Sequence, residues 1–215
     1  MKAFTPFNIN FSADPAKFEP HDLVIERSLR DSADLYYDPG AVAKMLEQDN
    51  PAIVKVWMAL LPETGGHLMS CLTVIYPGKV GDEYFMSKGY IHTEEVYAPE
   101  YYITLKGQGK LLLQTRDGEV FISDMRPGIM NYIPGEWAHR TVNTSGEDFV
   151  FLGIFPAAAR RDYSFIELPQ GCRRAQRQAG SHRSSLAAPA SGKPDHDSCD
   201  RWQRLCRQRP VPTAG

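Results

Sequence analysis

Hydrophobic and polar residues alternate in short runs through residues 51–167. Runs of four to nine residues, rich in β-branched and aromatic side chains, predict strands at Ile53–Leu60, Leu68–Tyr76, Glu83–Met86, Tyr101–Leu105, Lys110–Gln114, Glu119–Ile122, Met130–Ile133 and Phe149–Phe155. Turn residues such as Pro77-Gly78 and Arg126-Pro127-Gly128 separate these runs. Because no helical pattern lies between the runs, the sequence indicates an all-β sandwich or barrel.

The first fifty residues show a mixed pattern with one clear helix signal. Asp38 can cap a helix, Pro39 suits its first turn, and Asn50-Pro51 stops it. We therefore predict a short helix after Asp38. The predicted domain, residues 1–167, then consists of an N-terminal extension (1–50) and a barrel (51–167).

The composition changes abruptly at residue 168. Residues 168–215 carry nine Lys and Arg against three Asp and Glu, an excess of six positive charges, in a chain whose formal charge is -2. The segment also has too few branched aliphatic residues to offset the entropy of ordering. We predict a basic, disordered tail, which either binds an anionic partner or is merely solvated.

The charge and hydropathy of the whole chain exclude some classes of protein. A net charge near zero argues against a protein that binds nucleic acid by neutralising phosphates. No apolar run reaches the roughly 18 to 20 residues of a membrane span, and the N-terminus lacks the apolar core of a secretory signal. The expectation is a cytoplasmic protein.

Only two of the six histidines lie where a site is expected. His182 and His196 fall in the tail, and His21 is in turn-like surroundings, as is His67. His139 remains, in the stretch Gly-x5-Pro-x4-His-x3-Asn that runs from residue 128 to residue 143. This stretch resembles the second motif of the cupin proteins, although Glu136 stands where those proteins usually have Gly.

The other remaining histidine, His92, begins a second stretch. Glu100 follows it by eight residues, and Gly107 follows Glu100 by seven. The stretch resembles the first cupin motif, His-x-His followed by Glu and Gly, with Tyr90 in place of the first His. Glu94-Glu95 offers an alternative acid, but Glu100 keeps the spacing to the glycine.

A longer set of residues narrows the resemblance to the cupin-type glucose-6-phosphate isomerases of archaea and some bacteria. The resemblance covers roughly residues 5–167. The motifs that narrow it are Leu72–Glu83, Ser87-Lys88-Gly89, Lys106–Gln114, Tyr132–Pro134, Trp137–Asn143 and Asp162-Tyr163. The resemblance implies a cupin fold (a double-stranded β-helix, or jelly-roll barrel), a homodimer, and interconversion of glucose 6-phosphate and fructose 6-phosphate in glycolysis and gluconeogenesis.

The resemblance also implies a metal site. His92, Glu100 and His139 would be ligands of a divalent ion, with Fe²⁺ expected and Mn²⁺, Zn²⁺ and Ni²⁺ as alternatives. Tyr90 takes the place of a fourth ligand. A neutral phenol is a poor ligand for such an ion, so the sequence predicts three protein ligands and more water.

The remaining candidate residues would contact the substrate. The phosphate contacts implied by the resemblance are Thr73, Ser87, Lys88, Gly89 and Tyr163. Arg161 is a further candidate, with a solvated ion pair as the alternative. Glu100 would be the base, and Tyr102, on the same strand face, would either hydrogen-bond the sugar or pack in the sheet.

Two questions stay open at the level of sequence. The hydrogen could move between C1 and C2 by proton transfer through an enediol or by a metal-assisted hydride shift. The chain could also be a non-catalytic, degenerate sugar-phosphate-binding cupin, or another cupin metalloenzyme such as a dioxygenase.

Overall fold

The computed structural model describes residues 5–63, 66–92, 98–117 and 119–163, and about half of them lie in strands. The strands are β1 (Asn10–Ala13), β2 (Ala16–Glu19), β3 (Leu23–Ser28), β4 (Ala52–Ala59), β5 (Leu68–Ile75), β6 (Lys79–Val80), β7 (Glu83–Tyr84), β8 (Ile91–His92), β9 (Glu100–Lys106), β10 (Gly109–Gln114), β11 (Val120–Met125), β12 (Met130–Ile133), β13 (Ala138–Asn143), β14 (Phe149–Pro156) and β15 (Arg161–Asp162). The helices are the 3-10 helix η1 (Arg30–Leu35) and α1 (Pro39–Leu46). The prediction of an all-β fold with a short N-terminal helix is confirmed. Residues 168–215, predicted to be disordered, lie outside the described residues.

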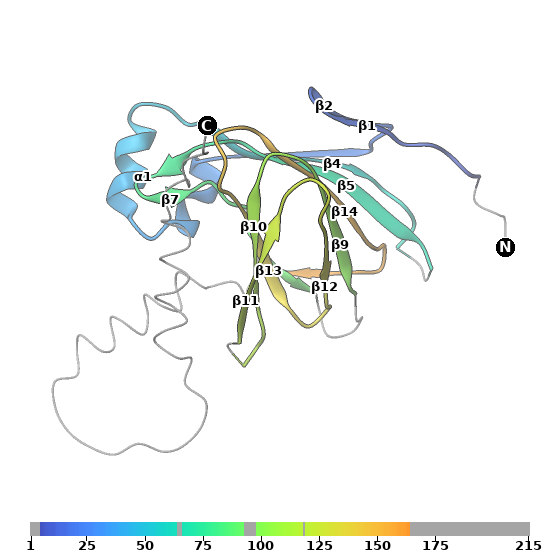
Figure 1. Ribbon diagram of the computed structural model, residues 1–215. Coiled ribbons are helices and arrows are strands. Elements are labelled where there is room, and N and C mark those ends of the chain that lie inside the picture. Colours follow the sequence, from blue (N-terminus) through green and yellow to red (C-terminus); the bar gives the residue numbers. More distant parts are fainter. Residues whose placement is uncertain (1–4, 64–65, 93–97, 118, 164–215) are drawn as a thin grey trace, which may run out of the picture.

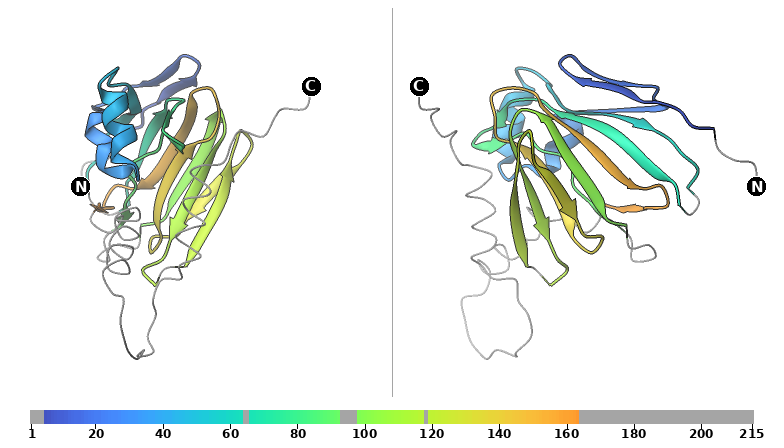
Figure 2. Two further views of the ribbon diagram at one scale, coloured as in Figure 1. Left: turned by 90° about the vertical axis from the view of Figure 1, so that its left-hand side faces the viewer. Right: turned by 45° about the vertical axis from the view of Figure 1, so that its right-hand side comes forward.

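Two antiparallel sheets face each other around the core (Figures 1 and 2). The larger has six strands in the order β12-β9-β14-β5-β4-β3, and the smaller has three in the order β11-β10-β13. Side chains from both sheets, among them Ile75, Leu111 and Phe149, form one buried cluster between them. The burial of this apolar surface is the main force that holds the two sheets together.

Strand β5 is buried on both faces. Successive side chains of a strand point to opposite faces, so Cys71 and Thr73 point to one side while Leu72 and Val74 point to the other. Leu72 and Val74 pack with Phe18 of the hairpin β1–β2, which lies over the outer face of the large sheet (Figure 1). The nearly continuous apolar run of β5 follows from this cover.

The helix α1 begins as predicted but ends earlier. Oδ1 of Asp38 accepts hydrogen bonds from the backbone N–H groups of Gly40, at 2.9 Å, and of Ala41, at 3.0 Å. These bonds satisfy donors that the first turn of a helix leaves free. The helix ends at Leu46 rather than continuing to Asn50.

Seven strands were not anticipated from the sequence, namely β1, β2, β3, β6, β8, β13 and β15, and β3 and β13 are the longest of them. Strand β3, within the segment assigned to an N-terminal extension, pairs with β4 and so belongs to the main sheet. Strand β13 reads Ala-His-Arg-Thr-Val-Asn, and all six of its residues are buried. Its polar residues hide the apolar alternation, and several of them form hydrogen bonds inside the protein; the Asn143 amide, for example, donates to the backbone carbonyls of Ile75 and Glu147 at 2.9 Å.

Gly109, on β10, packs tightly against the Phe149 ring of β14 in the other sheet, so we expect Gly109→Ala to destabilise the fold. A Cβ atom there would come 2.5 Å from the Phe149 ring and 2.6 Å from the Val142 carbonyl oxygen. We expect the free energy of unfolding to fall by about 1–3 kcal/mol, measured by chemical denaturation. Gly146→Ala is the matched control because a Cβ there meets nothing within 4 Å. An equal effect of both substitutions would contradict this packing.

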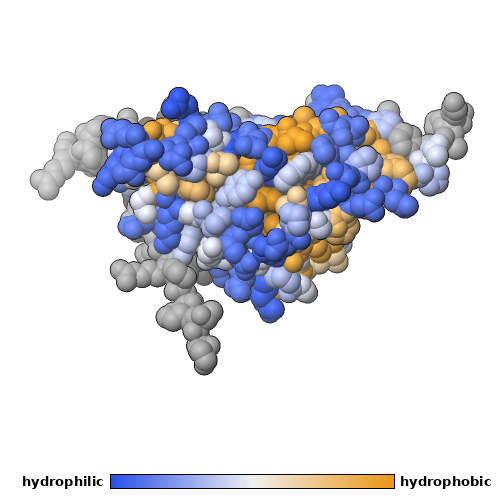
Figure 3. All heavy atoms as spheres, turned by 90° about the horizontal axis from the view of Figure 1, so that it is seen from above, coloured by the Kyte–Doolittle hydropathy of each residue, from blue (hydrophilic) through white to orange (hydrophobic). Residues whose placement is uncertain are grey.

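The surface carries both polar and apolar residues. Hydrophobic residues reach it between hydrophilic ones on the face shown in Figure 3. None of the described helices has the length and apolar character needed to cross a membrane.

Candidate functional site

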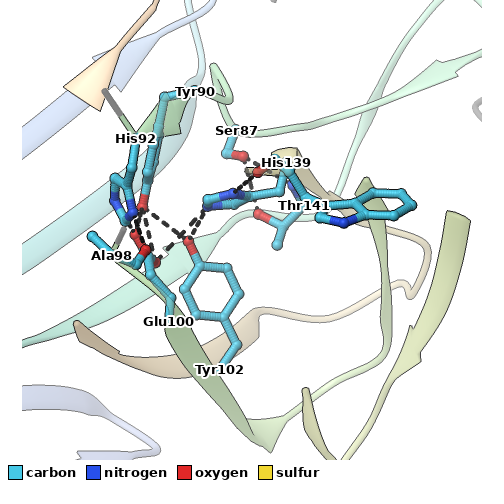
Figure 4. Close-up of polar contacts among 9 residues, drawn as sticks. Ser87, Tyr90, His92, Ala98, Glu100, Tyr102, His139 and Thr141 are labelled. Carbon is cyan, nitrogen blue, oxygen red and sulfur yellow. Dashed lines mark hydrogen bonds and ion pairs between the residues drawn. The ribbon is translucent and has the colours of Figure 1, made fainter. Parts of the chain in front are cut away.

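Glu100 lies at the centre of a buried cluster of two histidines and two tyrosines (Figure 4). The Tyr90 hydroxyl donates a hydrogen bond to the carboxylate, at 2.8 Å from Oε1 and 3.1 Å from Oε2. His92 Nε2 lies 2.7 Å from Oε1, and His139 Nε2 lies 3.8 Å from Oε2. The Tyr102 hydroxyl is 3.1 Å from both the Tyr90 hydroxyl and His139 Nε2. The structure therefore brings together every metal and catalytic candidate of the sequence.

Strand pairing brings these residues together from distant parts of the chain. Tyr90 and His139 form an antiparallel bridge, in which the N–H of each donates to the carbonyl of the other, at 3.1 Å and 2.9 Å. Glu100 and Tyr102 are two residues apart on β9 and therefore share one face. His92 follows Tyr90 on the same side, with ring centroids 5.5 Å apart.

Backbone carbonyl groups set the orientation of both imidazoles. His92 Nδ1 contacts the carbonyl oxygen of Ala98, and His139 Nδ1 contacts that of Trp137 at 3.2 Å. A carbonyl oxygen can only accept, so each Nδ1 must carry the proton. In the neutral rings Nε2 is then an acceptor, and both Nε2 atoms face Glu100. This orientation by a partner on the other ring nitrogen is typical of metal-binding histidines.

The contact between His92 and Glu100 indicates whether a metal ion suits these residues, because it places a ring nitrogen beside a carboxylate oxygen. His92 Nε2 is buried and has no aligned hydrogen-bond partner, although a carboxylate oxygen lies beside it. Two facing acceptor atoms are favourable only if a proton or a metal cation satisfies both. Two imidazoles and a carboxylate are ligands that suit Fe²⁺, Zn²⁺ and related ions. The donor set therefore fits a divalent ion.

The tyrosine hydroxyl groups form hydrogen bonds with two of these donors. Among the described residues, no group of three or more His, Cys, Asp or Glu side chains is placed so that it could hold a metal ion. Tyr90 bonds the Glu100 carboxylate and Tyr102 bonds His139 Nε2. An ion shared by these donors would replace those two contacts.

The environment shifts the pKa values of Glu100, His139, Tyr90 and Tyr102. Burial alone would raise the pKa of Glu100, but hydrogen bonds and the nearby histidines lower it overall, so the group is a carboxylate at neutral pH. Burial lowers the pKa of His139, which favours a neutral ring. Burial, followed by the Glu100 charge, raises the pKa values of Tyr90 and Tyr102 well above the ordinary value, so both remain neutral donors.

A cavity of about 80 Å³ adjoins the cluster. Tyr90 and Tyr102 line it on the side of the cluster. The five residues expected to contact phosphate also line it: Thr73, Ser87, Lys88, Gly89 and Tyr163. One continuous site therefore contains the cluster and the candidate substrate contacts.

Ser87 and Gly89 suit an anion for different reasons. Ser87 Oγ accepts hydrogen bonds from the backbone N–H and the hydroxyl of Thr141, at 3.0 and 3.1 Å, which leaves its own proton to be donated. Gly89 has a φ of +72°, in the left-handed region that a side chain disfavours. Lys88 Nζ lies 5.5 Å from the centre of the Tyr163 ring.

Sequence reasoning missed some residues of this site. Arg27 lines the cavity from β3, and Thr141 lines it from β13, a strand that was not predicted. Ile25 and Arg27 are two residues apart and both line the cavity, so the alternation of β3 could have placed Arg27 on this face. The alternative acids, Glu94-Glu95, lie outside the described residues.

Comparisons with known proteins identify the family to which this chain is similar. A model of the family described as Glucose-6-phosphate isomerase (GPI) matches residues 26–185. Glucose-6-phosphate isomerase from Thermococcus litoralis is 39% identical over 77% of this chain and 86% of that protein. The protein of the same name from Thermococcus gammatolerans is 46% identical over 78% of this chain and 87% of that protein. Among solved structures, oxalate decarboxylase from Bacillus subtilis at pH 4.6 is similar, with a TM-score of 0.45 and 19% identity over 65% of this chain and 36% of that chain.

Proposed function

Since the chain belongs to the glucose-6-phosphate isomerase family, we propose that it interconverts glucose 6-phosphate and fructose 6-phosphate at the Glu100 cluster. The observation that supports this best is the buried carboxylate beside a cavity lined by hydroxyl groups and cations. Moving a hydrogen between C1 and C2 of a sugar requires a base near the carbon and donors near the adjacent oxygens. The cluster and the cavity supply both.

In the proton-transfer route, Glu100 is the group that accepts the proton from carbon. It is ionised at neutral pH because its pKa is lowered despite burial. The same stabilisation makes it a weaker base, so its contacts must change when the substrate binds. Tyr90 donates to both carboxylate oxygens, and a substrate hydroxyl that displaces this donor would raise the basicity of Glu100.

Tyr102 supplies a hydroxyl donor at the reacting end of the substrate. Its single proton has two acceptors, His139 Nε2 and the Tyr90 oxygen, each at 3.1 Å. A hydroxyl shared in this way can turn towards a sugar oxygen at small cost. Tyr102 also packs against Phe151, with ring centroids 4.9 Å apart, so both roles expected from the sequence are compatible.

We assign the divalent ion to His92, Glu100 and His139, with Fe²⁺ as the expected metal. When bound there, such an ion would polarise the oxygens on C1 and C2 as a Lewis acid. The chain's own residues would orient the substrate and exclude water from the site. The proton-transfer and hydride-shift routes both remain compatible with this arrangement.

The proposal is tested by an activity assay on the purified full-length chain. We expect conversion of fructose 6-phosphate to glucose 6-phosphate after addition of Fe²⁺, Mn²⁺, Zn²⁺ or Ni²⁺, and loss of activity after chelation. A chain that binds metal but converts neither sugar phosphate would contradict the proposal and favour the non-catalytic alternative. The homodimer and the cytoplasmic location stay predictions.

A further inference from the structure

We infer that Arg27 and Arg161 form a cationic anchor for the phosphate group of the substrate. The inference deepens the proposed function and rests on it. The resemblance supplied hydroxyl and backbone contacts for the phosphate, with Lys88 as a nearby charge. Arg161 was a further candidate, and the structure adds Arg27 and places both side chains at the cavity. Guanidinium groups are better suited to two-pronged recognition of a phosphate than an ammonium group is.

The charges that line the cavity are of one sign. Arg27, Lys88 and Arg161 line it, whereas no Asp or Glu is among the described residues that do so. Positive groups around a partly buried cavity repel one another and attract an anion. The lining therefore favours a ligand that carries negative charge.

Arg161 lacks a direct anionic partner. In the described part of the chain no carboxylate forms an ion pair with it, although Glu100 attracts it from a distance. Its Nε atom is buried without a hydrogen-bond partner. The guanidinium instead lies over the rings of Tyr90 and Phe155, with its central carbon 5.1 and 4.7 Å from their centroids. Aromatic rings stabilise the charge but do not satisfy its N–H donors, so the group remains ready for an anion.

The position of Arg161 relates the anchor to the reacting group. Arg161 pairs with His92 across strands β15 and β8. Tyr90 contacts both ends of the site, because its ring faces Arg161 and its hydroxyl bonds Glu100. A substrate held by its phosphate at Arg161 could therefore reach Glu100 with the other end of its chain.

Arg27 approaches the cavity from a different element. It lies on β3, next to β4 at the edge of the large sheet. Asp31 attracts Arg27 electrostatically, but no ion pair joins the two side chains. Two guanidinium groups from β3 and β15 can then share the two negative charges of a phosphate.

The test measures binding of sorbitol 6-phosphate, an open-chain sugar phosphate that cannot isomerise, to the metal-loaded full-length chain by calorimetry. We expect Arg161→Gln to weaken binding by about ten- to a hundredfold, the usual worth of hydrogen bonds to a charged group. Arg27→Gln should also weaken it, and the Arg161→Gln affinity should depend less on salt than that of wild type. Arg160→Gln is the matched control, because Arg160 is the exposed neighbour in sequence.

One further variant and one kinetic measurement complete the test. If Arg161→Gln does not fold, Arg161→Lys replaces it in the test, because Lys keeps the charge but not the planar guanidinium. Arg161→Lys and Arg27→Gln should each bind sorbitol 6-phosphate more weakly than wild type, but more tightly than a chain without the anchor. Wild-type affinity in all folded variants of Arg27 and Arg161 would overturn the anchor. An isomerase whose Michaelis constant for fructose 6-phosphate is unchanged by these substitutions would leave the function intact and reject the anchor. If these substitutions weaken sorbitol 6-phosphate binding in a wild-type chain that has no isomerase activity, the anchor is supported and the proposed function is rejected.

Discussion

Replacing Glu100 by Gln is expected to lower kcat for fructose 6-phosphate by about 10²- to 10⁴-fold, the usual contribution of a positioned general base. Gln keeps the size of the side chain and can still accept the hydrogen bond from Tyr90. It cannot take a proton from carbon, and it removes the negative charge that faces both histidines. Steady-state kinetics on metal-loaded protein measure the loss.

The control for this substitution is Glu136→Gln. Glu136 is exposed and lies three residues before His139, so its loss removes a nearby charge without touching the cluster. Its kcat should stay close to that of wild type. Binding of sorbitol 6-phosphate to the Glu100 variant should change little, because the phosphate contacts are intact. An active Glu100→Gln enzyme would exclude Glu100 as the base.

His92→Ala and His139→Ala are each expected to lower kcat by at least about a hundredfold. Both rings face Glu100 through Nε2, and His139 also orients the Tyr102 hydroxyl. Groups that act as one unit show non-additive effects, so the double variant should be little worse than the poorer single variant. His21→Ala serves as the control, because His21 is an exposed residue outside the cluster and the cavity.

A multiplicative loss in the double variant would contradict a single shared site. Circular dichroism and thermal unfolding check that each variant folds. Both imidazoles are buried, and removing either leaves a cavity that costs some stability. Activity should therefore be compared at a temperature at which every variant is folded.

The fold could be predicted where side chains alternate in the usual way. The strand at residues 130–133 agrees with its prediction, and β4 and β14 agree within one residue at each end. The pattern failed at β13, because His139, Arg140 and Asn143 are polar yet buried and bonded within the barrel. Alternation detects burial of apolar residues, and it cannot detect burial of polar ones.

The site could be anticipated from motif spacing, but its hydrogen bonds could not. The spacing around His139 and Glu100 selected the residues that meet in the cluster. The proton on each Nδ1 depends on backbone carbonyls of Ala98 and Trp137, whose positions only the folded chain determines. The unpaired state of Arg161 likewise depends on which acidic residues the fold places nearby.

The central claim is that His92, Glu100 and His139 bind one ion together, and metal affinity tests it most directly. Competition with a chelating dye would give the affinity for Mn²⁺ of wild type, His92→Ala, His139→Ala and the double variant. We predict one ion per wild-type chain, at least about a tenfold loss in each single variant, and a non-additive loss in the double variant. Wild-type affinity in either single variant would contradict the shared site.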